Sequence, residues 1–159
     1  MSVSVQAEAF DAGQEIAALT RDTHGIGAVA SFVGLVRDMH GGNGGDARVT
    51  AMTLEHYPGM TEHALEEIVA DARRRWALLA VRVIHRYGRL LPGEAIVLVI
   101  VASAHRGEAF AACEFIMDYL KTRAPFWKKE EGTDGLASAR WVDACDSDDT
   151  AAQRWGQKQ

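Results

Sequence analysis

The sequence predicts an α+β fold, and three stretches of the chain support that class. Residues 94–104 (EAIVLVIVASA) form the most apolar run and have the length and β-branched content of a buried strand. Residues 81–90 form a second predicted strand, which a turn at Pro92 and Gly93 joins to the first as an antiparallel hairpin. A helical pattern follows from residue 105 onward. Strands and helices thus alternate irregularly with at least one hairpin, as is typical of α+β proteins.

The N-terminal part of the chain predicts a strand, a helix and a second strand. Apolar and polar residues alternate over residues 3–7, which indicates a short opening strand, and residues 12–21 have helical spacing. Residues 28–37 (AVASFVGLVR) predict a buried strand that ends at a positive charge. The glycine-rich run 38–47 (DMHGGNGGDA) is expected to be a mobile loop: a lid, a flap that contacts a partner, or a tolerated surface insertion.

The middle of the chain predicts a further strand followed by a helix. Residues 49–57 have the pattern of a strand with Met52, Leu54 and His56 on one face. Thr61 is the predicted N-cap of the helix, because a threonine hydroxyl accepts a hydrogen bond from a backbone N–H of the first turn. The apolar face of this helix consists of Leu65, Ile68, Val69, Ala72 and Trp76.

The helix after the most apolar strand is the centre of the prediction. It begins at His105 and Arg106 and is expected to end near Arg123, because Pro125 has no N–H and disfavours helical geometry at the residue before it. Its predicted buried face consists of Phe110, Cys113, Met117 and Leu120. The remaining predicted elements are a loop over 131–139, a short strand over 140–142 and a terminal helix over 146–155.

Length and composition limit the class of protein. A chain of 159 residues favours one domain, 1–159, with residues 146–159 as its C-terminal helix and tail. The net charge of −5 argues against a nucleic-acid surface, which needs broad positive charge. Cys113 and Cys145 show no metal-ligand spacing, so neither a disulfide framework nor a metal site is predicted. Without a signal peptide or a membrane span in the sequence, we expect a reduced, cytoplasmic protein.

Basic residues at both ends of the central helix suggest a site for an anionic ligand. His105 and Arg106 stand at the helix start, where free N–H groups and the helix dipole favour anions. Lys121 projects from the edge of the buried face, with Arg123 and Lys128 close in sequence. Desolvation and like charge would lower the pKa of such a lysine and make it a proton shuttle or a nucleophile.

Each of these residues also has an ordinary structural interpretation. Lys121 can lay its methylenes on the core with its ammonium in water, and His105 can be a satisfied residue at a helix start. Lys128 and Lys129 precede two glutamates and can form a solvated face. Arg37 supplies a further anion contact only if its strand neighbours the central one. The residues alone therefore predict an anion site with a candidate catalytic lysine and leave the reaction open.

Four segments resemble one known family in both order and spacing. They are FVGLVR at 32–37, HYPGMTEHALEEIV at 56–69, SAHRGEAF at 103–110 and FIMDYLKTRAPFWKKE at 115–130. In these segments the chain resembles the large, catalytic subunits of molybdopterin synthase, and the likeness extends to RWVDA and the terminal AAQRW. The resemblance implies an α/β-hammerhead fold with a mostly antiparallel sheet and a homodimer within a heterotetramer.

The reaction that the resemblance implies is sulfur transfer. A small ubiquitin-like partner carries sulfur as a thiocarboxylate on its C-terminal Gly-Gly tail, which enters a pocket of the large subunit. Two sulfurs then pass to cyclic pyranopterin monophosphate and form the dithiolene of molybdopterin, the precursor of the molybdenum cofactor. The resemblance implies no metal and no cofactor bound to this sulfurtransferase.

The resemblance also assigns residues to roles. The two active-site lysines of the family correspond to Lys121 and Lys128, with Lys121 either a proton-transfer group or a transient acyl acceptor. The implied substrate-binding residues are Leu35, Val36, Arg37, His105, Arg106, Lys121, Lys128, Lys129 and Glu130. Many relatives carry a lysine where this chain has Leu35, which argues against a charged role for position 35. The neighbouring subunit is expected to complete each pocket.

Two questions stay open at this point. Phe126 and Trp127 either stack on the pterin or pack under the turn at Pro125. The alternative to an enzyme is a non-catalytic module of the same fold that binds the partner or an anion without turnover. The presence of both Lys121 and Lys128 favours the enzyme.

Overall fold

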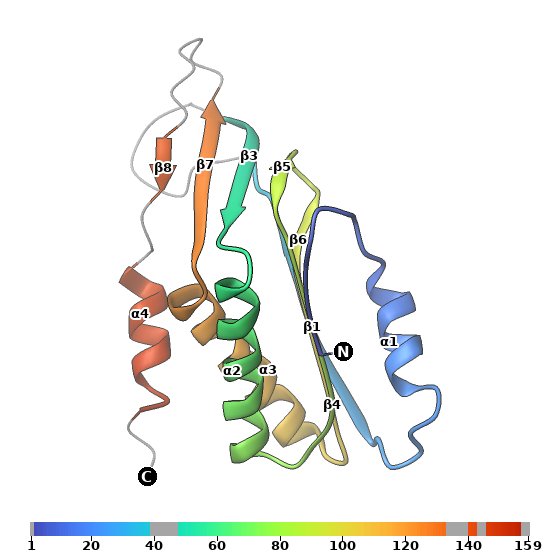
Figure 1. Ribbon diagram of the computed structural model, residues 1–159. Coiled ribbons are helices and arrows are strands. Elements are labelled where there is room, and N and C mark those ends of the chain that lie inside the picture. Colours follow the sequence, from blue (N-terminus) through green and yellow to red (C-terminus); the bar gives the residue numbers. More distant parts are fainter. Residues whose placement is uncertain (1, 39–47, 133–139, 143–145, 157–159) are drawn as a thin grey trace.

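The computed structural model describes residues 2–38, 48–132, 140–142 and 146–156, which form two four-stranded sheets and four helices (Figure 1). In chain order the elements are β1 (Val3–Gln6), α1 (Ala12–Thr20), β2 (Ala28–Leu35), β3 (Val49–His56), α2 (Met60–Arg75), β4 (Leu78–Arg86), β5 (Gly88–Leu90), β6 (Ala95–Ser103), α3 (Arg106–Arg123), β7 (Phe126–Gly132), β8 (Arg140–Val142) and α4 (Asp146–Gln153). Among these described strands, only β1 and β4 pair in parallel. The predicted α+β class is confirmed.

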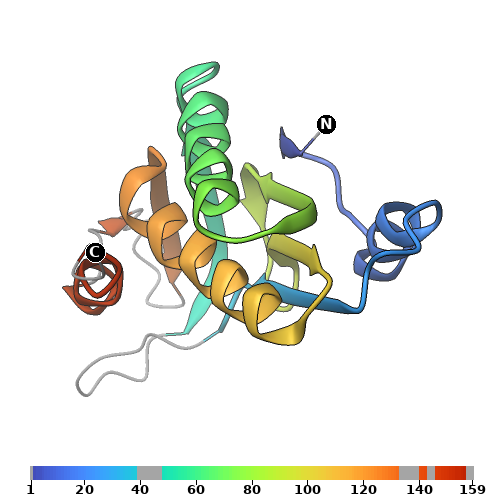
Figure 2. The ribbon, with the colours of Figure 1, turned by 90° about the horizontal axis from the view of Figure 1, so that it is seen from below.

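The first sheet has the strand order β1-β4-β6-β2 and helices on both faces. Viewed from below, α1 lies on one side of the sheet, and α2 and α3 lie on the other (Figure 2). The apolar face of α1 packs on Ile84, Leu98 and Ile100. The larger core lies between the opposite face of the sheet and α2 and α3. The last seven residues of β6 are buried and β6 pairs antiparallel with β4, so the predicted buried strand and its antiparallel pairing are both confirmed.

The strand predicted over residues 81–90 is in fact two strands in two sheets. β4 ends at Arg86, and β5 pairs with β3 of the second sheet. Gly88 at the break has a φ of 91°, which residues with a side chain rarely adopt. The chain therefore passes from one sheet to the other here, and the end of β4 lies at their junction.

The prediction that residues 28–37 form a buried strand is wrong, because β2 is the edge strand of the first sheet and ends at Leu35. Large apolar side chains along it are exposed to solvent, with fractions of 37% for Val29, 40% for Phe32, 40% for Val33 and 53% for Leu35. An apolar edge strand with one unpaired side is a surface suited to association with another chain.

The start of α2 differs from the prediction, because Gly59 and not Thr61 is the N-cap. The backbone N–H of Gly59 donates to the Glu62 carboxylate at 2.7 Å. Thr61 is fully buried inside the first turn, where its hydroxyl accepts from the Tyr57 N–H and donates to the carbonyl of Pro125 at 3.0 Å. Thr61 therefore ties the start of α2 to the turn between α3 and β7.

The second sheet has the order β5-β3-β7-β8, and β7 is a strand that the sequence pattern did not predict. It pairs antiparallel with β3 on one side and with β8 on the other. The strands predicted over 49–57 and 140–142 are confirmed as β3 and β8. Most of the predicted loops 38–47 and 131–139, together with Cys145, lies outside the described residues.

The predicted central helix and terminal helix are confirmed as α3 and α4. Cys113, Met117 and Leu120 of α3 are buried as expected, whereas Phe110 is 66% exposed and does not belong to the core. The buried face is instead completed by Phe115 and Ile116, among others. Of the helices that the structure describes, none combines the length and the apolar character that a membrane span requires.

Candidate functional site

The two groups of basic residues predicted to form one site lie at opposite ends of α3. His105 is the N-cap of this helix, and Lys121 stands in its last turn. A helix of 18 residues is about 27 Å long at 1.5 Å per residue. One chain therefore cannot bring His105 and Arg106 to the same ligand as Lys121, and the expectation of a single site within one chain is corrected.

Arg37 lies at the same end of the molecule as Lys121 because of the strand directions. β2 runs antiparallel to β6, with Leu35 opposite Ala95, so β2 ends where β6 begins. α3 follows β6 and runs back along the sheet (Figure 1), so its last turn, which contains Lys121, lies toward that end. Arg37, the second residue after β2, is exposed there.

Lys128 belongs to β7 of the second sheet, which packs against the segment that leads to Arg37. In β7 it pairs with Leu54 of β3, and Glu130 pairs with Met52. Leu54 and Met52 form a buried cluster with Val36. Directly opposite residues of antiparallel strands share a face, so Lys128 and Glu130 lie on the face of the sheet that packs against Val36. Lys129 alternates to the other face.

The surroundings of Lys121 differ from those that the sequence suggested. Its side chain is 50% exposed, and its Nζ lies 3.4 Å from the Oδ1 of Asp148 in α4. Arg123 points to the other side of α3, where its guanidinium covers the Tyr119 ring at 3.9 Å and pairs with Asp71. Lys121 thus has a carboxylate beside it and is only half desolvated, so the burial and the cationic neighbour Arg123 on which the expected activation rested are absent.

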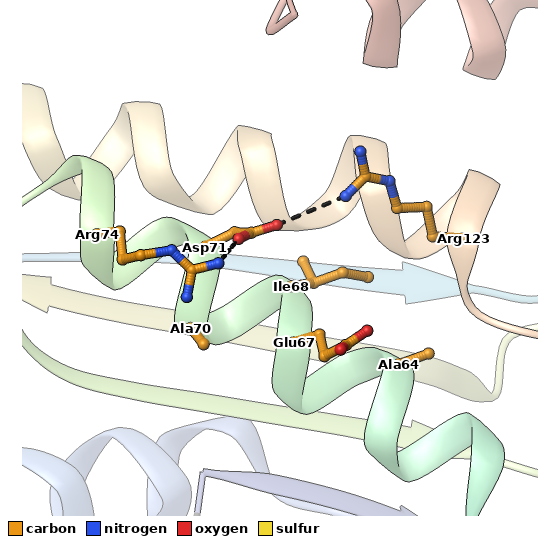
Figure 3. A pocket seen from close by; sticks show the side chains of 7 residues that line it. All are labelled: Ala64, Glu67, Ile68, Ala70, Asp71, Arg74 and Arg123. Atoms are coloured by element: carbon orange, nitrogen blue, oxygen red, sulfur yellow. Dashed lines mark hydrogen bonds and ion pairs between the residues drawn. The ribbon is translucent and has the colours of Figure 1, made fainter.

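A depression of about 300 Å³ lies on the α2 side of α3 and does not belong to the lysine site (Figure 3). Its lining residues are Ala64, Glu67, Ile68, Ala70, Asp71, Arg74 and Arg123. Both arginine side chains pair with Asp71, as the dashed lines of Figure 3 show. Lys121 reaches instead toward α4, so this depression offers no route to its ammonium group.

His85 supports the start of β7 and was not identified from the sequence. Its ring stacks on the ring of Phe126 with centroids 3.6 Å apart, and its side chain belongs to the buried end of β4. Its Nδ1 lies 2.9 Å from the carbonyl oxygen of Arg86, and a carbonyl only accepts, so Nδ1 carries the hydrogen. Phe126 is therefore a packing residue, whereas Trp127 is 46% exposed and available to a ligand.

Arg86, the neighbour of His85 in β4, supports the Arg37 side of the site. Its guanidinium donates to the carbonyl oxygens of Ala7 and Ala95 at 3.1 Å each, and it pairs with Glu94. The carbonyl of Glu94 accepts a hydrogen bond from the Val36 N–H at 2.9 Å. Adjacent residues of β4 point to opposite faces, so His85 and Arg86 brace the two segments that carry Lys128 and Arg37.

Burial sets the charge state of His85. Desolvation lowers its pKa from 6.5 to about 4, its hydrogen bond to Arg86 opposes the shift, and nearby His56 adds to it. The ring of His56 stacks on that of Tyr87 with centroids 4.4 Å apart, and its Nε2 lies 3.7 Å from the Oε1 of Glu62. The ring of His85 is therefore neutral near pH 7.

The depressed pKa of His85 predicts a loss of stability in acid. Between pH 6.5 and 4 the unfolded chain binds a proton at this position and the folded chain does not, so the free energy of unfolding falls as the pH falls. A shift from 6.5 to about 4 corresponds to about 3 kcal/mol across that window. Urea unfolding of the wild type and of His85→Gln at pH 7 and pH 4.5 measures the difference.

The control for this measurement is His63→Gln. His63 is 72% exposed on α2, so this variant loses a histidine without disturbing a buried side chain. His85→Gln should lose less stability than the wild type between the two pH values. Equal losses in the wild type and His85→Gln would contradict a buried neutral histidine at position 85.

No group of three or more His, Cys, Asp or Glu side chains within the described ranges is arranged to hold a metal ion. The candidate site residues with ionisable side chains include three cations. Arg37, Lys121 and Lys128 can hold phosphate or carboxylate groups, and a lysine can donate a proton or accept an acyl group.

Comparisons with known proteins identify a family. A family model described as MoaE protein matches residues 5–123. The chain is 59% identical over 155 residues to a Ralstonia nicotianae protein named molybdopterin synthase catalytic subunit, which covers 98% of this chain and 84% of that protein. A Pseudomonas aeruginosa protein of the same name is 57% identical and covers 98% of this chain and 99% of its own length.

A solved structure agrees with these similarities. The structure of molybdopterin cofactor biosynthesis protein E from Burkholderia multivorans matches with a TM-score of 0.80 at 52% identity. The match covers 99% of this chain and 98% of that chain. The two chains therefore share their fold over nearly their whole length.

Proposed function

Because this chain belongs to the MoaE protein family, we propose that it is the catalytic subunit of a molybdopterin synthase. It transfers sulfur from the thiocarboxylated Gly-Gly tail of a small ubiquitin-like partner to cyclic pyranopterin monophosphate. The observation that carries this proposal is 59% identity to a molybdopterin synthase catalytic subunit across 98% of the chain. The gathering of Arg37, Lys121 and Lys128 at one end of the molecule supports it, because both the pterin phosphate and the tail are anionic.

Within this function the residues divide into two roles. Lys121 and Lys128 are the proposed catalytic residues, since an amino group can transfer a proton or accept an acyl group. Leu35, Val36, Arg37, Lys129 and Glu130 form the proposed rim. Val36 is buried, so it acts by placing Arg37, and Lys129 faces away from Lys128 and contributes least.

The remaining proposed substrate residues, His105 and Arg106, are best supplied by a second copy of the chain. Ala28 pairs with Ser103, directly before His105, and Leu35 leads to Arg37 at the other end of β2. A twofold axis perpendicular to β2 reverses the strand, so the Ala28 end of one copy meets the Leu35 end of the other. That arrangement brings the Arg106 end of α3 in one protomer next to Arg37 of its partner.

The exposed surface of β2 supports such a dimer. Val29, Phe32, Val33 and Leu35 are exposed along a strand that is paired on one side only. Burial of these side chains against a second copy would remove them from water. We therefore propose a homodimer with two composite sites, each of which receives the tail of one small partner, as in a heterotetramer.

Reconstitution tests the proposed function. The purified chain, the thiocarboxylated partner and cyclic pyranopterin monophosphate should together yield the dithiolene product. A partner without its last two glycines should give no product and should still bind, because its folded surface shares the binding with the tail. Binding of the intact partner and the pterin without product would instead favour the non-catalytic module.

A further inference from the structure

α4 is fixed along α3 by contacts at its C-terminal end. The indole N–H of Trp155 donates to the Oδ2 of Asp118 at 2.7 Å, and its ring packs edge-on against Trp76 and Phe115. Arg154 pairs with the carboxylates of Glu114 and Asp118 at 2.6 and 2.9 Å. Trp155 is only 8% exposed, so this end of the helix is an anchor with an apolar centre.

The spacing of residues along α3 and α4 relates the contact between Asp118 and Trp155 to the position of Lys121. On α3, Asp118 and Lys121 lie three residues apart and share one stripe of the helix surface. On the α4 side, Asp148 lies in the first turn of the helix, and Trp155 follows the last helical residue, Gln153, by two positions. With Trp155 fixed on Asp118, Asp148 lies opposite Lys121, and the two charged groups are 3.4 Å apart.

The Asp148 carboxylate is more shielded than an ordinary surface charge. Its side chain is 26% exposed, against 50% for Lys121. A lysine side chain has several rotatable bonds and an unpaired ammonium samples many positions, so a shielded carboxylate fixed by a packed helix restricts where Nζ lies. The carboxylate also accepts a hydrogen bond from the ammonium group at 3.4 Å.

We propose that Asp148 is a positioning residue for Lys121: α4 holds this carboxylate so that the lysine is presented to the substrate as an oriented ammonium group. This inference rests on the proposed function only for its consequence in catalysis. It favours a proton-donating or anion-stabilising role for Lys121 over that of an acyl acceptor, because an amine must lose its proton before it attacks a carbonyl.

The first test measures Lys121 alone and needs no partner or substrate. Acylation of Lys121 by an activated ester at fixed pH, followed by mass spectrometry, reports how freely its Nζ reacts when it is or is not engaged by a carboxylate. Asp148→Asn should increase the rate roughly two- to fivefold, as expected for loss of a partly exposed ion pair. Asp148→Glu should stay near the wild-type rate, since it keeps the charge.

The matched control is Asp149→Asn. Asp149 is the next residue of the same helix and is exposed, so its substitution changes the net charge equally without touching Lys121. Acylation of Lys121 in this variant should match the wild type. Equal rates in Asp148→Asn and Asp149→Asn would overturn the proposed pairing, whatever the protein's function.

The second test measures sulfur transfer in the reconstituted complex. Asp148→Asn should lower kcat by about tenfold with KM within about twofold, because orientation of Lys121 acts on the reacting geometry while other cations bind the substrate. Asp148→Glu should recover most of the loss. Wild-type kcat in Asp148→Asn would overturn the positioning role, whereas absence of product in the wild type would overturn the proposed function and leave the acylation result standing.

Discussion

Replacement of Lys121 by alanine is expected to lower the rate of dithiolene formation by at least about 100-fold, the lower range for loss of a positioned proton-transfer group. Lys121 is the amine at the end of α3 where Arg37 and Lys128 also lie, and the chain offers few other lysines. Single-turnover assays with saturating thiocarboxylated partner measure the chemical step directly. Loss of rate at saturation separates a catalytic role from one in binding.

The fold should survive this substitution. Lys121 is half exposed and its pair with Asp148 is partly solvated, so the free energy of unfolding should change by about 1 kcal/mol or less. Arg123→Ala is the matched control, since Arg123 is a cation of similar exposure two residues later that points toward Asp71. Full activity of a folded Lys121→Ala protein, or an equal loss in Arg123→Ala, would contradict the assignment.

The elements predicted correctly from sequence patterns are those whose burial or boundaries follow from their own residues. β6 is apolar on both faces and buried on both, and α3 has a proline that marks its end, so local chemistry and final structure agree. β2 is equally apolar but lies at a sheet edge. An apolar pattern indicates that the side chains of a strand favour burial. It does not indicate whether the same chain or another chain buries them.

Other elements depend on contacts between distant residues. β7 has the sequence FWKKEEG, with charged residues on both faces and therefore no alternating apolar pattern. Its strand structure depends on pairing with β3 and β8. His85 is one of three polar residues in β4, and only the stack on Phe126, 41 positions away in sequence, reveals its role. The pair of Lys121 and Asp148 likewise exists because two helices pack together. Patterns within one segment contain no signal for such contacts.

For the candidate site too, some features follow from the sequence and others from the three-dimensional arrangement. The resemblance to a family assigned site roles to Lys121, Lys128, His105 and Arg106 in the sequence, and these roles stay predictions. The length of α3 then separates His105 and Arg106 from the lysines. That separation follows from helix geometry once 18 residues are assigned to one helix, so it could be predicted from the sequence.

Mixing two defective variants tests whether the site is shared between protomers. Arg106→Ala alone should reduce activity by about 10- to 100-fold, as expected for loss of a charge-assisted contact to phosphate. Lys121→Ala alone should be nearly inactive. A mixed dimer of the two variants, however, contains one site with both substitutions and one with neither, if Lys121 and Arg106 of a site come from different protomers.

Unfolding and refolding an equal mixture of the two variants should therefore restore about one quarter of wild-type activity, because half of the dimers are mixed and each has one intact site of two. The separate variants, refolded in the same way, should gain nothing. If each site belonged to one chain, every site in the mixture would carry one substitution and no activity would return. A β2 substitution such as Val33→Asp should abolish the recovery, since a charge on the proposed interface prevents the dimer from forming.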